Sequence, residues 1–257
     1  MSVRSARLRR ELVTLVVRSN GLLGVNRSGG VRESDIGASL PSLAAILAIV
    51  GAKHEGPSSP GAGWMGERYP FRTLPDYLRP GLDLVFVGIN PGLYSVRRGH
   101  YFARSTSRFW PAFSASKLSE PVRRALGADT LCAEHDAELP RFGIGFTDVV
   151  KRPTANAADL EATDFEKWVP RILERLRRYA PRVACFHGLT AYRPFLNLAL
   201  RRAKRLPMLG AQPEVVGATQ FYVVPNPSPA NAHFTLTDQT VWYNRLADFL
   251  ASVRARD

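Results

Sequence analysis

Cysteine is scarce in this chain, which contains only Cys132 and Cys185 among its 257 residues. Two cysteines so far apart provide neither the ligand spacing of a zinc site nor a disulfide framework. An iron–sulfur cluster held by four cysteines is excluded within one chain. The cysteine content therefore favours a reducing compartment.

Long hydrophobic runs are also missing. No apolar stretch approaches the ~18–20 residues that a membrane-spanning helix needs, so we expect no membrane association. The N-terminus is basic with a short apolar patch at residues 12–17, which favours an ordinary amphipathic helix over a secretory signal or an organellar transit peptide. We expect a cytoplasmic, nucleoid-associated protein, or a nuclear or organellar one if the source is eukaryotic.

Acidic residues are too few to balance the basic ones. The 35 lysines and arginines against 22 aspartates and glutamates give a formal charge of +13 and a pI near 10.4. This excess fits a polyanionic partner, most commonly nucleic acid, although an arginine-rich proteome would produce the same number. The remaining composition is that of a soluble globular protein, and the length suffices for one sizeable α/β domain.

Several site signatures are absent. The sequence contains no P-loop, no G-x-G-x-x-G and no nucleophile elbow, which argues against nucleotide-binding and hydrolase domains of those types. The histidines are scattered without metal-ligand spacing: His54, His100, His135, His187 and His233. We therefore expect neither a metal nor a cofactor.

The sequence does contain a series of short buried strands. Residues 84–87 form an unbroken apolar run, LVFV, which the glycine, asparagine and proline of GINPG end. Similar short runs at 146–150, 183–186 and 221–224 predict three more strands. Helical patterns lie between and after them, and strands alternating with helices predict an α/β fold with a mostly parallel sheet.

Three helices are expected around this sheet. Apolar residues at helical spacing predict one within 109–125. A capping-box spacing at 163–166 opens a second helix that runs to Tyr179, with arginines opposite its apolar stripe. Pro170 is where this helix would kink or restart. The last helix covers 237–253.

The chain divides at a stretch rich in glycine, proline and serine, residues 51–66. Residues 1–65 form an N-terminal extension, partly helical or flexible, whose role the sequence does not disclose. Residues 66–257 form the α/β domain.

Polar side chains follow three of the predicted strands. Asn90 follows the first strand, His187 the third and Asn226 the fourth. Ligands bind at the carboxyl ends of parallel strands, so we expect these side chains to meet. The loop after Asn90 also mixes cations, which suit phosphates, with aromatic rings, which stack on bases.

Four segments together resemble one known family. They are GINPGL at 88–93 with Gly99-His100 and Phe109-Trp110 beyond it, RTLPD at 72–76, GIGFT at 143–147, and VPNPS at 224–228. This series is similar to the motifs of the mismatch-specific uracil-DNA and thymine-DNA glycosylases, from about residue 72 to about residue 250. The resemblance implies a three-layer α/β/α sandwich around a four-stranded, mostly parallel sheet. It also implies hydrolysis of the N-glycosidic bond of a uracil or thymine flipped out of DNA.

The resemblance implies catalytic roles for two residues. Asn90 matches the family's water-positioning asparagine, and its amide can orient a water but cannot act as a true base near neutral pH. Asp148 stands where the thymine-specific relatives carry asparagine. Its carboxylate could activate the water better than Asn90, or it could be a structural cap at a strand end, and both alternatives stay open.

Three further residues are expected at the base. Phe102 matches the aromatic residue on which the flipped base stacks. Backbone amides near Ile89 and Phe102 are the expected donors to the pyrimidine edge. His187 occupies the position of a side chain near the base, where the thymine-specific enzymes carry asparagine. It could donate to a uracil carbonyl, or be an ordinary satisfied polar group. Because histidine replaces asparagine here, the base preference stays open.

The segment 225–234 resembles the loop that wedges into the duplex. The family has a bulky or cationic residue where this chain has Ala230, so Asn231 or His233 would have to contribute, and we expect a weaker dependence on the opposing base. Ser228 and backbone amides would clamp phosphates. Further candidates for phosphate contacts are Arg97, Arg98, Arg104 and Arg108.

The sequence therefore predicts a monomeric DNA-repair glycosylase that removes uracil, and perhaps thymine or other modified pyrimidines, from DNA. No lysine stands in a motif as a Schiff-base nucleophile, so we expect a monofunctional enzyme that leaves an abasic site. Two alternatives are a catalytically silent relative that binds damaged DNA and an enzyme that acts on free nucleotides.

Overall fold

The computed structural model describes residues 69–256 of the chain. The predicted N-terminal extension 1–65, its apolar segments and the domain boundary at residue 66 lie outside these residues. Within the described part, no helix combines the length and the apolar character needed to cross a membrane.

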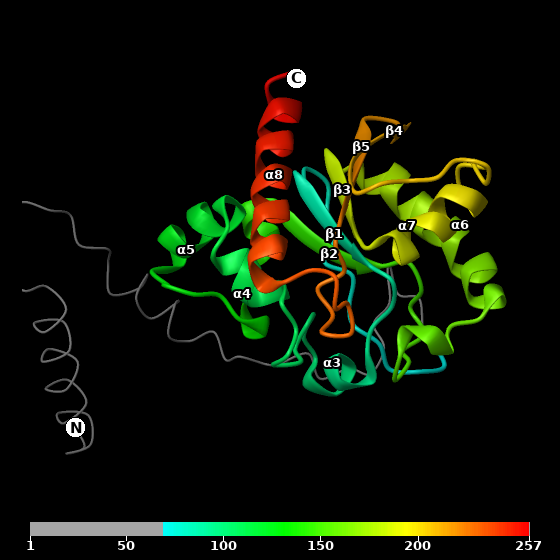
Figure 1. The fold of residues 1–257 in the computed structure, drawn as a ribbon, viewed down its shortest axis with the longest axis horizontal. Helices are drawn as coiled ribbons and strands as arrows, with labels where there is room; N and C mark the ends of the chain where they lie inside the picture. Colours follow the sequence, from blue (N-terminus) through cyan, green and yellow to red (C-terminus); the bar gives the residue numbers. More distant parts are fainter. Residues whose placement is uncertain (1–68, 257) are drawn as a thin grey trace, which may run out of the picture. The chain divides into compact units, whose positions relative to one another are not determined.

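A five-stranded sheet forms the centre of the described domain (Figure 1). The strand order is β2-β1-β3-β5-β4, and the first four of these run parallel. The parallel strands are β1 (Leu84–Gly88), β2 (Ile144–Asp148), β3 (Val183–His187) and β5 (Thr219–Val224). The mostly parallel α/β sheet is thus confirmed.

The predicted number of four strands is wrong, because β4 (Gly210–Val216) pairs antiparallel with β5 at one edge of the sheet. Its sequence, GAQPEVV, begins with glycine and contains Pro213, and its register shifts between Ala211 and Val215. Proline and an irregular register are tolerated only at a sheet edge, where the ladder is paired on one side. A segment with this glycine and proline content does not predict a strand when only the sequence is known.

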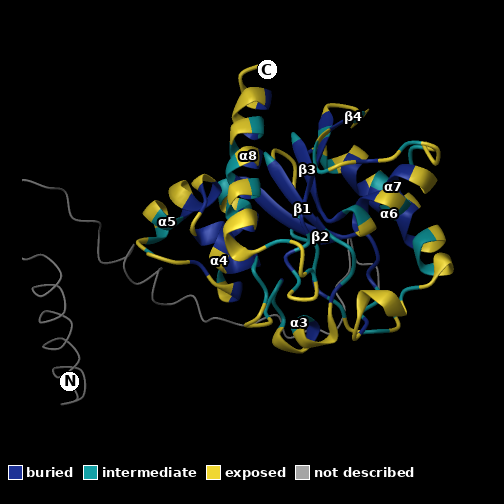
Figure 2. Ribbon diagram, in the orientation of Figure 1, coloured by how far each residue is buried: buried dark blue, intermediate teal, exposed yellow. Residues whose placement is uncertain are grey.

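Both faces of the sheet are covered, so the fold is a three-layer α/β/α sandwich (Figures 1 and 2). Along β1, Leu84 and Phe86 point into one hydrophobic cluster while Val85 and Val87 point into the other. This alternation follows from the two-residue period of a strand. The first cluster includes α4 (Phe109–Ser114), α5 (Glu120–Leu126) and α8 (Leu236–Arg254), and the second includes α6 (Ala162–Tyr179) and α7 (Leu189–Leu198).

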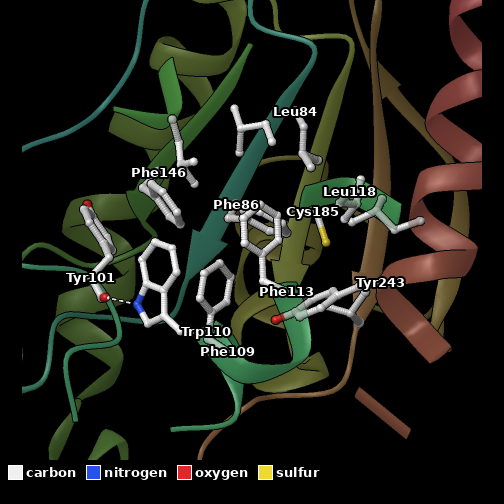
Figure 3. Close-up of a cluster of buried hydrophobic side chains, with 14 of the residues drawn as sticks. Leu84, Phe86, Tyr101, Phe109, Trp110, Phe113, Leu118, Phe146, Cys185 and Tyr243 are labelled. Atoms are coloured by element: carbon white, nitrogen blue, oxygen red, sulfur yellow. Dashed lines mark hydrogen bonds between the residues drawn. The ribbon is translucent and has the colours of Figure 1, made fainter. Parts of the chain in front are cut away.

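Aromatic rings dominate the first cluster (Figure 3). Phe86 of β1 packs edge-to-face against Phe109 with ring centroids 5.2 Å apart, and stacks on Phe146 of β2 at 5.7 Å. The indole of Trp110 donates a hydrogen bond to the backbone oxygen of Tyr101 at 2.9 Å. Because Tyr101 belongs to the loop that follows β1 and α3 (Leu93–Arg98), this bond fixes the loop beside the strand ends.

Two helix predictions need correction. The segment 109–125, within which one helix is expected, contains two, α4 and α5, separated by a 3-10 turn at Lys117–Ser119. Ser116 between them is extended, and its hydroxyl bonds the Phe113 carbonyl, which ends α4.

The second correction concerns α6. It starts at Ala162, where the carboxylate of Asp164 accepts from the Glu161 amide, and continues unbroken through Pro170. Pro170 is exposed, so the carbonyl that loses its helical partner can be hydrated. The arginines of α6 do not all lie opposite the apolar stripe, because Arg175 is fully buried.

Candidate active site

The carboxyl ends of the parallel strands meet at one small pocket of about 210 Å³. This is below the range of sites for drug-sized ligands, ~300–1,000 Å³, and suits a single ring. Eight residues predicted from the sequence line this pocket: Ile89, Asn90, Phe102, Arg104, Asp148, His187, Asn226 and Ser228. The structure therefore brings together side chains from three strand ends and two loops.

Asn90 is held in one orientation. Its Nδ2 donates to the carbonyl oxygen of Arg152 at 3.0 Å and to Thr154 Oγ1 at 2.8 Å. The single hydroxyl hydrogen of Thr154 is donated to the Asn156 carbonyl at 2.6 Å, so Thr154 can only accept from Asn90. Both partners are acceptors, which fixes the amide flip and leaves Oδ1 of Asn90 as the acceptor available to a water.

Thr154 was not identified from the sequence. It lies 64 positions after Asn90 and is held beside the first loop by two backbone hydrogen bonds, Leu93 N–H to Thr154 O at 3.0 Å and Thr154 N–H to Pro91 O at 3.2 Å. No motif or spacing in the sequence connects a single threonine in a loop with an asparagine so far away. Its role becomes visible only when β1 and β2 are paired.

Phe102 has an unusual backbone conformation, with φ of 54°. A positive φ is costly for a bulky residue and persists where the surroundings enforce it. The next amide, that of Ala103, donates to Ser95 Oγ at 3.3 Å, and the Phe102 ring stacks on Phe109 with centroids 4.2 Å apart. Phe109 covers one face of this ring, and Phe102 also lines the pocket, so the ring can contact a base that enters the pocket.

His187 is only 2% exposed at the end of β3. Burial lowers the pKa of its imidazole to about 3, so the ring is neutral at physiological pH. Nε2 lies 3.0 Å from the Tyr243 hydroxyl, which can either donate or accept. Nδ1 is buried and has no hydrogen-bond partner within residues 69–256, which leaves an unmet polar atom in a residue that lines the pocket.

Asp148 is 3% exposed at the end of β2 and lies against β1. Its Oδ1 lies so close to Gly88 that a Cβ at that position would overlap it, which explains the glycine. Burial raises the pKa of the Asp148 carboxyl to about 6, although Lys151 Nζ at 3.7 Å acts in the opposite direction. A pKa near the working pH is what a proton acceptor requires.

The loop after β5 is anchored by Arg108. Its Nη1 donates to the carbonyl oxygens of Ser228 at 2.8 Å and Asn231 at 3.1 Å, and its backbone amide donates to Pro227 O at 3.0 Å. Arg108 was a candidate for phosphate contact, but its guanidinium is used to hold this loop. The side chain of Asn231 is also used within the loop, since Nδ2 donates to the Asn226 carbonyl at 3.0 Å.

The remaining predicted DNA contacts, apart from Arg104, lie outside the pocket. Ala230 and Asn231 line an adjoining groove of about 800 Å³, whereas His233 is exposed and lines neither cavity. Arg97 and Arg98 are exposed and also line neither, and Arg98 pairs with Glu134 at 3.4 Å. Among the four candidate arginines, the one at the rim of both cavities is Arg104.

Metal binding has no obvious place in this arrangement. In the part of the chain that the structure describes, no group of three or more histidine, cysteine, aspartate or glutamate side chains is placed to hold a metal ion. The pocket instead presents an amide oxygen, a carboxylate, a neutral imidazole and an aromatic face.

Comparisons with known proteins agree with the motifs. The sequence profile described as the uracil DNA glycosylase superfamily matches residues 75–249, more than half of the chain. A curated relative, the G/U mismatch-specific uracil DNA glycosylase of Schizosaccharomyces pombe, is 31% identical over 154 residues, which are 58% of this chain and 45% of the relative. The chain thus matches less than half the length of that protein.

A solved structure from Methanosarcina acetivorans, titled provisionally as a uracil DNA glycosylase, is 20% identical, with a TM-score of 0.42 over 68% of this chain and 98% of that one. The profile match contains three of the four motifs in full and the last two residues of RTLPD, and it includes every residue that lines the pocket except Leu74. This chain belongs to the uracil DNA glycosylase superfamily.

Proposed function

We propose that this protein hydrolyses the N-glycosidic bond of uracil in DNA and leaves an abasic site. The observation that carries the proposal is the meeting of Asn90, Asp148, Phe102 and His187 in one pocket sized for a single ring. The Schizosaccharomyces pombe relative, a G/U mismatch-specific uracil DNA glycosylase, supports uracil as the base.

In this mechanism the flipped uracil stacks on the Phe102 ring, on the side opposite to Phe109. Stacking on one aromatic ring contributes ~1–3 kcal/mol. Nδ1 of His187 then meets the polar edge of the base, which offers an N–H donor and carbonyl acceptors. A neutral imidazole can match either, depending on its tautomer.

Asn90 places the attacking water through its free Oδ1, and Asp148 accepts the proton as the water oxygen bonds to C1′. The electron pair of the broken C1′–N1 bond leaves with the base, whose developing negative charge is stabilised by hydrogen bonds in the pocket. Asn90 alone has no useful proton affinity, so the carboxylate supplies what the amide lacks.

We expect a monofunctional enzyme. None of the residues lining the pocket is a lysine, and Lys151 behind it donates to Asp76 at 2.9 Å, so its Nζ is engaged there and not in the pocket. The opposing base is expected to matter less than in strict mismatch enzymes, because Ala230 is exposed and too small to fill a vacated base position.

Base release from uracil-containing oligonucleotides tests the proposal. Wild type, Asn90→Ala and Asp148→Ala are assayed on single strands and on U·G, U·A and T·G duplexes. We expect release of uracil by wild type and a loss of about 10²-fold or more in Asn90→Ala, because a misplaced water costs about that much. Affinity for uracil DNA should be retained.

Asn197→Ala is the matched control, since this asparagine is exposed on α7 away from the pocket and should leave turnover unchanged. If wild type binds uracil DNA but releases nothing from any substrate, the protein is a silent DNA-binding relative. If it releases bases only from free nucleotides or nucleosides, the assignment to DNA is wrong.

A further inference from the structure

Behind the pocket lies a row of four buried charges, which we call the buried charge row: Arg175, Asp76, Lys151 and Asp148. Arg175 Nε lies 3.4 Å from Asp76 Oδ2, and Lys151 Nζ lies 2.9 Å from Asp76 Oδ1 and 3.7 Å from Asp148 Oδ2. The side chains of all four are at most 4% exposed. The charges alternate from α6 to the pocket, so each ion faces one or two opposite charges.

Only one member of the buried charge row, Asp148, lines the pocket. A buried ion pair seldom increases stability relative to well-packed apolar residues, because removing two charges from water costs more than their attraction returns. This row ends at a carboxylate that lines the pocket. Its effect on the position and protonation of that carboxylate explains it better than a contribution to stability.

We propose that Lys151 and Asp76 are positioning residues for base release: they hold the Asp148 carboxylate at the pocket and set the pH above which it can accept a proton. This inference rests on the proposed function for its effect on turnover, but not for its effect on Asp148 itself.

The two residues act on Asp148 in opposite directions. Burial raises the pKa of Asp148, the Lys151 ammonium opposes that rise, and the Asp76 carboxylate adds to it. The Tyr101 hydroxyl, 3.5 Å from Lys151 Nζ, also faces this site: burial keeps it protonated by raising its own pKa, and its interaction with the carboxylate lowers the pKa of Asp148. Arg175 adds a second positive charge beside Asp76, with Nε 3.4 Å from Oδ2.

Lys151 is itself fixed by Asp76. The Asp76 carboxylate also accepts from Thr147 Oγ1 at 2.7 Å. Burial would raise the pKa of Asp76, but Lys151, Arg175 and the Thr147 hydrogen bond together outweigh burial and keep the pKa below its usual range, so Asp76 stays ionised. Lys151 Nζ therefore has an ionised partner, Asp76, at 2.9 Å and a titratable partner, Asp148, at 3.7 Å.

The test is the pH profile of single-turnover uracil release in wild type, Lys151→Met and Asp76→Asn. We expect wild-type release to rise with pH and level off above about pH 6, the pKa of Asp148. In Lys151→Met the inflection should move up by about 1–3 units, the usual effect of an opposite charge at this distance. In Asp76→Asn it should move down.

Lys151→Arg should keep the inflection near the wild-type value, since it restores the cation. Lys117→Met is the matched control, because Lys117 pairs with Asp248 at 2.9 Å on the surface, and should not shift the profile. A purely structural role would lower turnover at every pH without moving the inflection. That result, or shifts of the same sign in both variants, would overturn the proposal.

A second readout does not need activity. The carboxyl carbon of Asp148 is titrated by NMR in the same variants, with Asp148→Asn to assign the resonance, and should shift with the same signs. If release is absent but these shifts occur, the proposed function fails and the inference stands. If Lys151→Met does not fold, the test rests on Asp76→Asn. A lower pKa of Asp148 in that variant supports the inference, and an unchanged pKa refutes it.

Discussion

The side chain of Asn90 has a defined orientation only because of its neighbours. Arg152 O and Thr154 Oγ1 take both hydrogens of its amide group, so its oxygen is the atom left for a water. An asparagine without such partners could turn its amide over at little cost, and half of its orientations would then present a donor where an acceptor is required.

Thr154→Val should therefore slow base release while leaving affinity for uracil DNA unchanged. Valine keeps the volume of threonine but removes the oxygen that accepts from Asn90. A single hydrogen bond contributes about 1 kcal/mol, so we expect a loss of roughly fivefold in single-turnover rate. Thr154→Ser keeps the hydroxyl and should retain most of the rate; a Val variant as fast as wild type would exclude this role.

The residues that could be predicted are those whose position follows from a strand end. Asn90 and His187 each follow an apolar run, and the strand-end rule places both at one edge of the sheet. Thr154, Lys151 and the loop-anchoring role of Arg108 could not be predicted in this way. Their partners lie far away in the sequence, and only the packed structure brings them together.

At the scale of elements, the buried parallel strands were predictable because a short, continuous apolar run is typical of a strand covered on both faces. The edge strand β4 and the break between α4 and α5 were not predictable, because in each the local hydrogen bonding departs from the regular pattern of a strand or helix. An edge strand has one paired side and tolerates Pro213, and the Ser116 hydroxyl replaces a helical hydrogen bond at the end of α4.

The loop after β5 gives a prediction at this scale. Arg108→Ala removes the two guanidinium hydrogen bonds to Ser228 O and Asn231 O, and leaves both carbonyls without this donor. Hydrogen bonds to charged groups are worth about 1.5–3 kcal/mol. We expect faster amide hydrogen exchange in residues 226–234 and uracil release slowed by roughly 10–100-fold.

The control for this loop is Arg123→Ala. Arg123 bonds Ser119 Oγ at 3.1 Å on α5 and does not contact residues 226–234, so exchange in the loop should stay as in wild type. Protection of the loop that survives the loss of Arg108 would show that other contacts hold it.

At the scale of the whole molecule, the formal charge of +13 predicts strong and salt-sensitive binding to DNA, but not which residues meet the phosphates. The structure separates candidates that the sequence treats alike. Arg104 lies at the rim shared by the pocket and the adjoining groove, whereas Arg98 lines neither and is paired with Glu134.

The salt dependence of DNA affinity distinguishes these arginines. Each phosphate contact contributes about −0.9 to the slope of log K against log salt on duplex DNA. We expect Arg104→Gln to flatten the slope by about that amount, and Arg98→Gln to leave it unchanged because Arg98 lies away from both cavities. Fluorescence anisotropy of uracil duplexes in the Asn90→Ala background measures binding without turnover. A flatter slope for Arg98→Gln alone would place the DNA backbone along α3, away from the groove, and would require a different path for the strand that carries the flipped base.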